Sequence, residues 1–297
     1  MNKLKRLPGR HFGPRNTAQK IDEINGNDPD LNTAFQDGCP IQSPDGLKLY
    51  IATNRPGGHG DLDIWMATRA SKQSPWGAAV DLPEPINSAS DDFCPTPVGK
   101  HGLLFVSRRA IAGVTCGLGD IYFSRSHAAE WDEPHHFACA PEGPNSTLDE
   151  QGPSYAKGHL YFSSSSTAVP GDLYVSRKNG PLSFGAATPI AELNDAVAND
   201  IQPNVRKDGR EVVFSSNRTG GRGGQDIWSA TRASADAPWT VAVNLGSVVN
   251  TAFGETRPSL SRDALQLLFG RAGPVGTGEG NSGLADVYVA TREESEH

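Results

Sequence analysis

The stretch that decides the fold is VVFSSNRTGGRGGQDIWSATR, residues 212–232. It joins an apolar triplet, a Gly-rich stretch, an Asp, two apolar residues and a closing Thr-Arg. Four variants of this phrase occur, at residues 49–69, 103–125, 160–177 and 267–292. Self-similarity of this kind is typical of repeat architectures, in which each copy is one supersecondary unit.

The repeat has the length of a propeller blade. The Asp residues that anchor the five copies are Asp63, Asp120, Asp172, Asp226 and Asp286. Successive intervals are 57, 52, 54 and 60 residues, somewhat above the roughly 40 to 50 residues usual for propeller blades. Each unit therefore has room for four short strands, and the alternation in V-Y-V-A-T at residues 287–291 is the period-2 pattern of a strand.

A second phrase, Asn followed by Asp or Glu and then Pro, precedes each copy. Its Asn residues are Asn32, Asn87, Asn145, Asn194 and Asn250, and its prolines are Pro40, Pro95, Pro153, Pro203 and Pro258. We expect the innermost strand of each blade to run through the proline. Segments such as SPWGAAVDLPEPIN, residues 74–87, predict the outer edge strand of the preceding blade.

The sequence thus predicts an all-β, five-bladed β-propeller of four-stranded antiparallel blades. The fifth copy has no outer strand after it, and residues 12–32 look like that missing strand placed at the start of the chain. Pairing the N-terminal segment into the last blade closes the ring and protects the sheet edges. We expect an N-terminal extension over 1–11 and a single domain over 12–297. The predicted blades span about 33–87, 88–145, 146–194, 195–250, and 251–297 plus 12–32.

Composition excludes some functions. The net charge of −7 and the pI near 5.6 argue against nucleic acid, because phosphate binding needs a concentrated basic surface. No apolar run approaches the roughly 18 residues of a membrane span, so no membrane insertion is expected. The basic segment 1–10 lacks the apolar part of a signal peptide. The compartment stays open: it is cytoplasmic for the chain as written, and periplasmic or secreted if a leader was lost by trimming. We expect a monomer.

One motif carries a family resemblance. The pattern S-N-R-x-G-G-x-G-x-x-D-I-W at Ser216–Trp228, its weaker copy at Thr53–Trp65 and S-P-D-G at Ser43–Gly46 resemble the TolB-type propeller repeat. The resemblance implies repeated four-stranded blades and modules that bind proteins, polysaccharide or peptidoglycan-linked partners. Propellers with related blades include peptidases and other enzymes. TolB itself is implied to have six blades and a separate α/β domain, and both are absent from this chain.

One carboxylate per blade stands three residues before the proline of the innermost strand. These are Asp37, Asp92, Glu150, Asp200 and Glu255. We expect them to ring one mouth of the central channel, where facing carboxylates cannot all stay ionised without cations. The cation can be an Arg side chain or a bound Ca²⁺, which takes six to eight oxygen ligands.

Arginines are available to most of these carboxylates. Because the first two strands of a blade are antiparallel, Arg55, Arg109 and Arg218 are expected beside Asp37, Asp92 and Asp200. Arg271 stands at a shifted position near Glu255, and blade three offers only Ser166 to Glu150. Glu150 is thus the expected cation-free carboxylate, with a raised pKa suited to a general acid.

The remaining polar repeats have structural interpretations. The anchoring Asp residues occur in all five copies, as do the closing arginines Arg69, Arg125, Arg177, Arg232 and Arg292. We assign both sets to the construction of the blades, because a single active site needs residues that differ between blades.

Cys39 and Cys94 each precede a proline in neighbouring blades. A thiol pair near the mouth and two small buried side chains are both possible interpretations. His59 is the one histidine expected at the mouth. The four cysteines match no usual zinc spacing.

The sequence is compatible with two functions. The first is a non-catalytic binding module whose upper face engages a protein or glycan, because no catalytic motif occurs. The alternative is a glycosidase-like hydrolase that uses two ring carboxylates as acid and base. Its candidate catalytic residues are Glu150, Asp92 and Asp37, and the five carboxylates with Arg55, Arg109, Arg218 and His59 form the expected ligand site. No cofactor is required, and a channel-bound Ca²⁺ held by the five carboxylates is compatible with either function.

Overall fold

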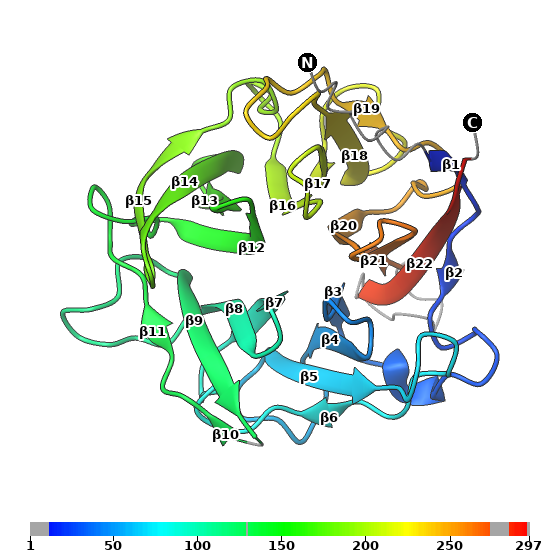
Figure 1. Ribbon diagram of the computed structural model, residues 1–297, viewed down its shortest axis with the longest axis horizontal. Helices are drawn as coiled ribbons and strands as arrows, with labels where there is room; N and C mark the ends of the chain where they lie inside the picture. Colours follow the sequence, from blue (N-terminus) through cyan, green and yellow to red (C-terminus); the bar gives the residue numbers. More distant parts are fainter. Residues whose placement is uncertain (1–11, 129, 274–284, 296–297) are drawn as a thin grey trace, which may run out of the picture.

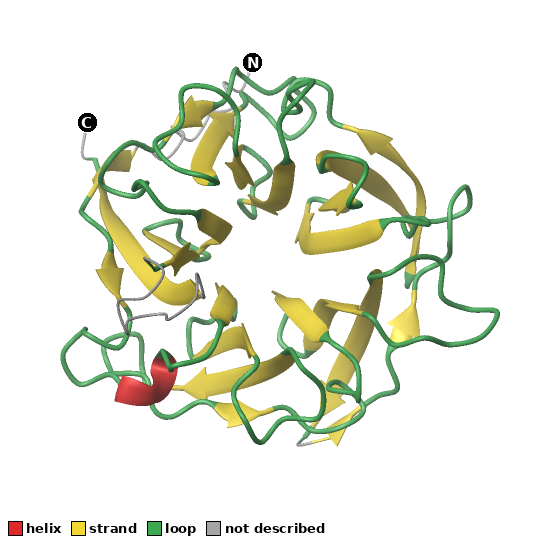
Figure 2. Ribbon diagram, turned by 180° about the vertical axis from the view of Figure 1, so that it is seen from behind, coloured by secondary structure: helices red, strands yellow, loops and turns green. Residues whose placement is uncertain are grey.

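Five antiparallel sheets surround a central axis (Figure 1). The computed structural model describes residues 12–128, 130–273 and 285–295. The expected extension 1–11 and residues 274–284 lie outside this part. The predicted all-β, five-bladed propeller is confirmed. Within the described ranges the one helical element is the short 3₁₀ turn η1 (Pro29–Leu31), red in Figure 2, and no helix there is long and apolar enough to cross a membrane.

The two inner strands of each blade follow the predicted phrases. The innermost strands are β3 (Asp37–Gln42), β7 (Asp92–Val98), β12 (Asp149–Ala156), β16 (Asp200–Val205) and β20 (Glu255–Leu260). The second strands are β4 (Lys48–Thr53), β8 (Gly102–Ser107), β13 (His159–Ser165), β17 (Glu211–Ser216) and β21 (Gln266–Ala272). We call the face where the innermost strands begin the upper face, and the face of the turns between these two strands the lower face.

The third and fourth strands complete each blade. The third strands are β5 (Asp63–Thr68), β9 (Asp120–His127), β14 (Asp172–Gly180), β18 (Asp226–Thr231) and β22 (Ala285–Glu294). The outer strands are β6 (Val80–Asp81), β10 (Glu130–Trp131) and β11 (His135–His136), β15 (Ser183–Pro189), β19 (Val243–Asn244), and β1 (Phe12–Arg15) and β2 (Gln19–Lys20).

The chain start completes the last blade, as predicted. Both β1 and β2 pair with β22, with Phe12 opposite Glu294 and Gln19 opposite Val289. In Figure 1 the blue β1 and β2 run along the outer side of the red β22. This pairing joins the two ends of the chain in one sheet and closes the ring.

Each repeated Asn ties one blade to the next. Its side-chain oxygen accepts a hydrogen bond from the backbone N–H of the residue after an anchoring Asp, at 2.7 to 2.9 Å. The pairs are Asn32 with Val287, Asn87 with Ile64, Asn145 with Ile121, Asn194 with Leu173, and Asn250 with Ile227. Only the first pair spans the ring closure. The need to satisfy these N–H groups explains why Asn recurs at this position.

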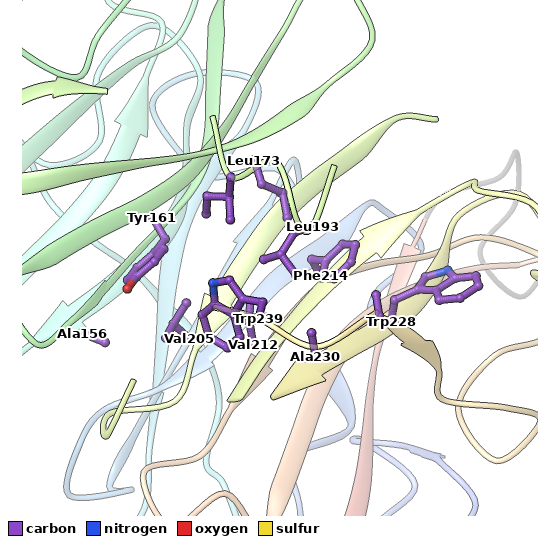
Figure 3. Packing of buried hydrophobic residues seen from close by; sticks show 12 residues of the cluster. Ala156, Tyr161, Leu173, Leu193, Val205, Val212, Phe214, Trp228, Ala230 and Trp239 are labelled. Carbon is purple, nitrogen blue, oxygen red and sulfur yellow. The ribbon is translucent and has the colours of Figure 1, made fainter. Parts of the chain in front are cut away.

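The hydrophobic core lies in the gaps between blades. Figure 3 shows the gap between blades three and four, where the Trp239 ring lies between Tyr161 and Phe214, with Leu173 and Leu193 beside them. Each third strand alternates its side chains between the gaps on its two sides. A shift of one residue along the strand therefore moves a side chain from one gap to the other.

Such a shift distinguishes blades two and three. In blades one, four and five the closing Arg comes six residues after the anchoring Asp, whereas Arg125 and Arg177 come five residues after it. Arg125 pairs with Gly102 and Arg177 with His159, at the positions that threonines occupy in the other three blades. The five closing arginines therefore occupy two different register positions.

Candidate functional site

The five ring carboxylates lie at the upper ends of the innermost strands. Four of them open their strand, and Glu150 is the second residue of β12. All five are fully buried, with 0 % exposure. They are turned into the blades. They ring the upper ends of the innermost strands as expected, but they are not open to the channel mouth.

Four of the five carboxylates pair with an Arg of their own blade. The predicted pairs form: Arg55 with Asp37 at 2.7 Å, Arg109 with Asp92 at 2.8 Å, Arg218 with Asp200 at 2.5 Å, and Arg271 with Glu255 at 2.9 Å. Burial of both partners explains the pairing, because a buried charge without a partner is strongly destabilising.

The other oxygen of each paired carboxylate is held by the chain just upstream. The backbone N–H donors are Thr33, Ser88, Asp195 and Thr251. The hydroxyls of Thr33 and Ser88 donate to the same oxygen as their N–H groups, whereas the Thr251 hydroxyl donates to the Glu255 oxygen that Arg271 also contacts. Each oxygen of these four carboxylates therefore already accepts a hydrogen bond. An Arg side chain, one of the two cations considered for this ring, thus stands beside each of the four carboxylates, and none of the five lines the channel cavity.

Glu150 differs from the other four. Its carboxylate accepts from the Ser146 hydroxyl at 2.5 Å, from the Ser146 N–H at 3.0 Å and from the Ser164 hydroxyl at 2.8 Å. The prediction that Ser166 stands beside Glu150 is wrong. The Ser166 N–H donates to the Val169 carbonyl, and its hydroxyl accepts from the N–H groups of Ala168 and Val169. Burial raises the pKa of Glu150 above its ordinary value, although the hydrogen bonds oppose that shift.

Blade three holds a second unusual carboxylate. Ser164 lies opposite both Glu150 and Asp172, so the three residues form one row across β12, β13 and β14. In blades two, four and five the anchoring Asp contacts an outer-strand side chain, respectively His136, Asn244 and Lys20. Blade three has Pro189 at that register position. Burial, with the charge of Asp200, raises the pKa of Asp172.

A second ring of side chains lines the channel itself. It consists of the residues just before the prolines, each at a positive φ between 47° and 58°: Cys39, Cys94, Gly152, Gln202 and Arg257. This backbone conformation interrupts the pairing of the two inner strands. These residues and the five prolines line a cavity of only about 30 Å³, and none of the five carboxylates does. The channel is therefore constricted at this level.

Cys39 and Cys94 meet in this constriction as free thiols. Both are buried, and they contact each other and Arg257. Burial raises the pKa of the Cys39 thiol. For Cys94, burial acts in the same direction, but the hydrogen bond from Cys39 and the Arg257 charge outweigh it and lower its pKa. The two cysteines are therefore small buried side chains and adjacent thiols at the same time, so both interpretations hold.

Sequence reasoning missed a polar cluster beside Glu150. Arg108 bridges Asp91 at 2.7 Å and Asp149 at 3.0 Å, and the Gln151 amide donates to Asp149 at 2.9 Å. One oxygen of Asp149, Oδ1, is buried without a hydrogen-bond partner. The sequence did contain a signal, the doublet Asp149-Glu150. Glu150 is the repeated carboxylate, and Asp149 is an additional carboxylate at a neighbouring position that is free to differ between blades.

His59, His136 and the other two cysteines lie away from the channel constriction. His59, expected at the mouth, instead approaches the outer-strand residue Asp81 at 3.2 Å. Cys116 and Cys139 form a disulfide that their sequence spacing did not reveal. The ligand atoms of Cys116, Asp120 and His136 lie within 4.8 Å of one another, but the disulfide removes the thiolate that a metal would need.

Comparison with known proteins gives a fold likeness only. No family model and no curated protein matches the sequence. Among similar solved structures, an α-L-arabinofuranosidase from Lactobacillus brevis has a TM-score of 0.54 at 14 % identity, covering 88 % of this chain and 92 % of its own. A GH62 hydrolase in complex with xylotriose has a TM-score of 0.54 at 13 % identity, covering 95 % and 96 %. A GH43 endo-arabinanase from Bacillus licheniformis has a TM-score of 0.52 at 13 % identity, covering 86 % and 93 %.

These comparisons correct two predictions. The resemblance to the TolB-type repeat is wrong, because no family model matches and the similar structures are family 43 and 62 glycoside hydrolases. The prediction of a non-catalytic binding module is contradicted as well, because the similar structures are glycoside hydrolases. At 11 to 14 % identity the likeness itself establishes the shared five-bladed fold.

Proposed function

We propose that this protein hydrolyses a glycosidic bond at the upper mouth of its channel, with Glu150 as the general acid. The observation that carries the proposal is the asymmetry of the carboxylate ring: four members are neutralised by Arg and Glu150 is held by two serines. An acid that donates a proton near neutral pH needs a pKa raised by its surroundings, and burial has that effect on Glu150.

The second carboxylate of such a reaction has to stay ionised. Asp92, in the neighbouring blade, forms an ion pair with Arg109 at 2.8 Å and suits that role. Asp37, the third candidate, has the same surroundings in blade one, one blade further from Glu150. We therefore assign the pair to Glu150 and Asp92.

Substrate access requires a local rearrangement. Glu150 is fully buried, and the Ser146 hydroxyl and N–H cover it. Ser146 lies in the connection between blades two and three, outside any strand. In the proposal a sugar hydroxyl takes over the hydrogen bond of the Ser146 hydroxyl, so that the glycosidic oxygen comes within reach of the acid.

The test is a hydrolysis screen with matched variants. The similar structures include enzymes named for arabinosides and xylosides, so arabino- and xylo-oligosaccharides with their nitrophenyl glycosides form the first panel. Glu150→Gln should lose at least about 100-fold in kcat, the range for loss of a general acid. Glu255→Gln alters the same ring position in an Arg-paired blade and should keep most of the activity of the folded protein. Equal loss in both variants, or no hydrolysis by the wild type on a broad glycoside panel, contradicts the proposal.

A further inference from the structure

A cavity of about 290 Å³ opens between blades two and three on the lower face. It lies at the opposite end of the strands from Glu150. Its walls include Phe123 and Phe137 of blade two and Tyr155 and Phe184 of blade three. Phe137 and Phe184 meet edge to face with ring centroids 5.2 Å apart, so the aromatic wall is fixed by packing.

The corresponding space is filled in three other gaps. There the closing Arg stacks on an aromatic ring of the outer segment, with 4.1 Å from Arg69 to Trp76 and 4.0 Å from Arg232 to Trp239. Arg292 stacks on Phe12 at 3.9 Å in the same way. The Arg nitrogens also donate to carbonyls of the lower turns, as Arg69 does to Gly46 at 2.7 Å. Each stack occupies its gap from the lower face.

Two sequence changes leave the gap between blades two and three open. Phe184, in S-F-G-A-A, stands where blade one has Trp76 in P-W-G-A-A, so the ring is smaller. The closing Arg of blade three comes one residue early, which places Lys178 at the position of the stacking Arg. The same shift in blade two turns Arg125 toward blade three. Both cations therefore line one cavity.

The charge of this cavity is one-sided. Its lining contains Lys100, Arg125 and Lys178 with His101, and no Asp or Glu. The three cations are exposed at the rim and form no ion pair with any described residue. The protein as a whole carries a net charge of −7, so a local basic rim does not follow from composition.

We infer that this cavity binds a small aromatic carboxylate. The ring would lie among Phe123, Phe137, Tyr155 and Phe184, and the carboxylate would meet the cations at the rim. Apolar walls with a few placed polar groups are the usual form of a small-molecule site, and the volume is near the lower end of the range of roughly 300 to 1,000 Å³ for such sites. A rigid aryl acid fits this size and charge. The inference is independent of hydrolysis at the upper face.

The experiment is calorimetric titration of the intact protein with 2-naphthoate. The amide 2-naphthamide has nearly the same shape without the charge and should bind at least 10-fold more weakly. Lys178→Met with Arg125→Met should weaken naphthoate binding at least 10-fold, whereas Lys157→Met, an exposed cation of the neighbouring lower turn that does not line the cavity, should leave it unchanged.

A filling variant provides the second readout. Phe184→Trp with Lys178→Arg copies the stack of blades one and four, keeps the charge and should abolish binding without lowering the melting temperature. Naphthoate binding that equals naphthamide binding, that persists in the filled variant, or that is absent from the wild type overturns the inference. Glycoside hydrolysis can succeed or fail independently of each of these outcomes.

Discussion

Ser164 lies directly opposite Glu150 in blade three and donates its hydroxyl to the carboxylate at 2.8 Å, whereas the same position in blade five is Arg271, opposite Glu255. The two carboxylates are otherwise alike: both are fully buried and both accept from a residue four positions upstream. The exchange of Arg for Ser therefore isolates the effect of one missing cation.

The stability of the two blades should reflect this exchange. Glu255→Gln leaves the Arg271 guanidinium largely buried without its counter-ion, and breaking a buried pair costs about 3 kcal/mol or more. Glu150→Gln strands no cation, and we expect a loss of about 1 kcal/mol from altered hydrogen bonds. Urea unfolding of both variants measures the difference. An equal loss in the two would show that Arg271 contributes nothing through its charge.

The pH dependence of stability should carry the signature of Glu150. Because its folded-state pKa is raised, the folded protein binds the proton more tightly than the unfolded chain does. Its contribution to stability is thus greatest below the unfolded pKa, near 4.5, and declines as pH rises through the folded pKa. Asp172 shifts in the same direction, so the wild type alone is not diagnostic.

The difference between two proteins removes that ambiguity. Relative to the wild type, Glu150→Gln should gain stability as pH rises above about 4.5. Unfolding free energies at several pH values between 4 and 8 measure this trend. A constant difference over that range would mean that Glu150 titrates in the folded protein as it does in the unfolded chain.

Most of the fold was predictable from sequence, because the repeat fixes strand order and the surplus segment 12–32 fixes closure. The Arg partners were predictable for the same reason, since antiparallel pairing places Arg55 beside Asp37. The inward turn of the carboxylates was not, because it depends on where the positive-φ residues such as Cys39 and Arg257 interrupt the strand. Departures confined to one blade, such as Asp149 and Lys178, were not predictable either, because recurrence reveals only what the blades share.

Ring closure should depend on Asn32. Its Oδ1 accepts from the Val287 N–H at 2.7 Å, 255 positions along the chain. Asn32→Ala leaves that N–H without a partner and should cost about 1 to 3 kcal/mol. Asn194→Ala removes the equivalent bond to Leu173 between blades that the chain connects directly. Hydrogen exchange should show β1 and β2 opening in the first variant only, and opening in both would refute a special role of Asn32 in closure.

The disulfide should stabilise blade two. Cys116 and Cys139 are separated by 23 positions, and closing a loop of that size contributes about 3 kcal/mol in the chain-entropy description. Cys116→Ser with Cys139→Ser should lower the melting temperature, and dithiothreitol should have that effect on the wild type only. Cys39→Ser provides a control: Cys39 is a free thiol, so this variant should keep the response to dithiothreitol. Insensitivity of the wild type to reductant would argue against the bond.

The central claim is that Glu150 supplies the proton to the departing sugar oxygen, and leaving-group dependence tests it most directly. A 2,4-dinitrophenyl glycoside needs little protonation, whereas an unactivated oligosaccharide needs a full proton transfer. We predict that Glu150→Gln loses at least about 100-fold in kcat on the oligosaccharide and less than about 10-fold on the dinitrophenyl glycoside. A loss of the same size on both substrates would contradict the assignment of Glu150 as the acid.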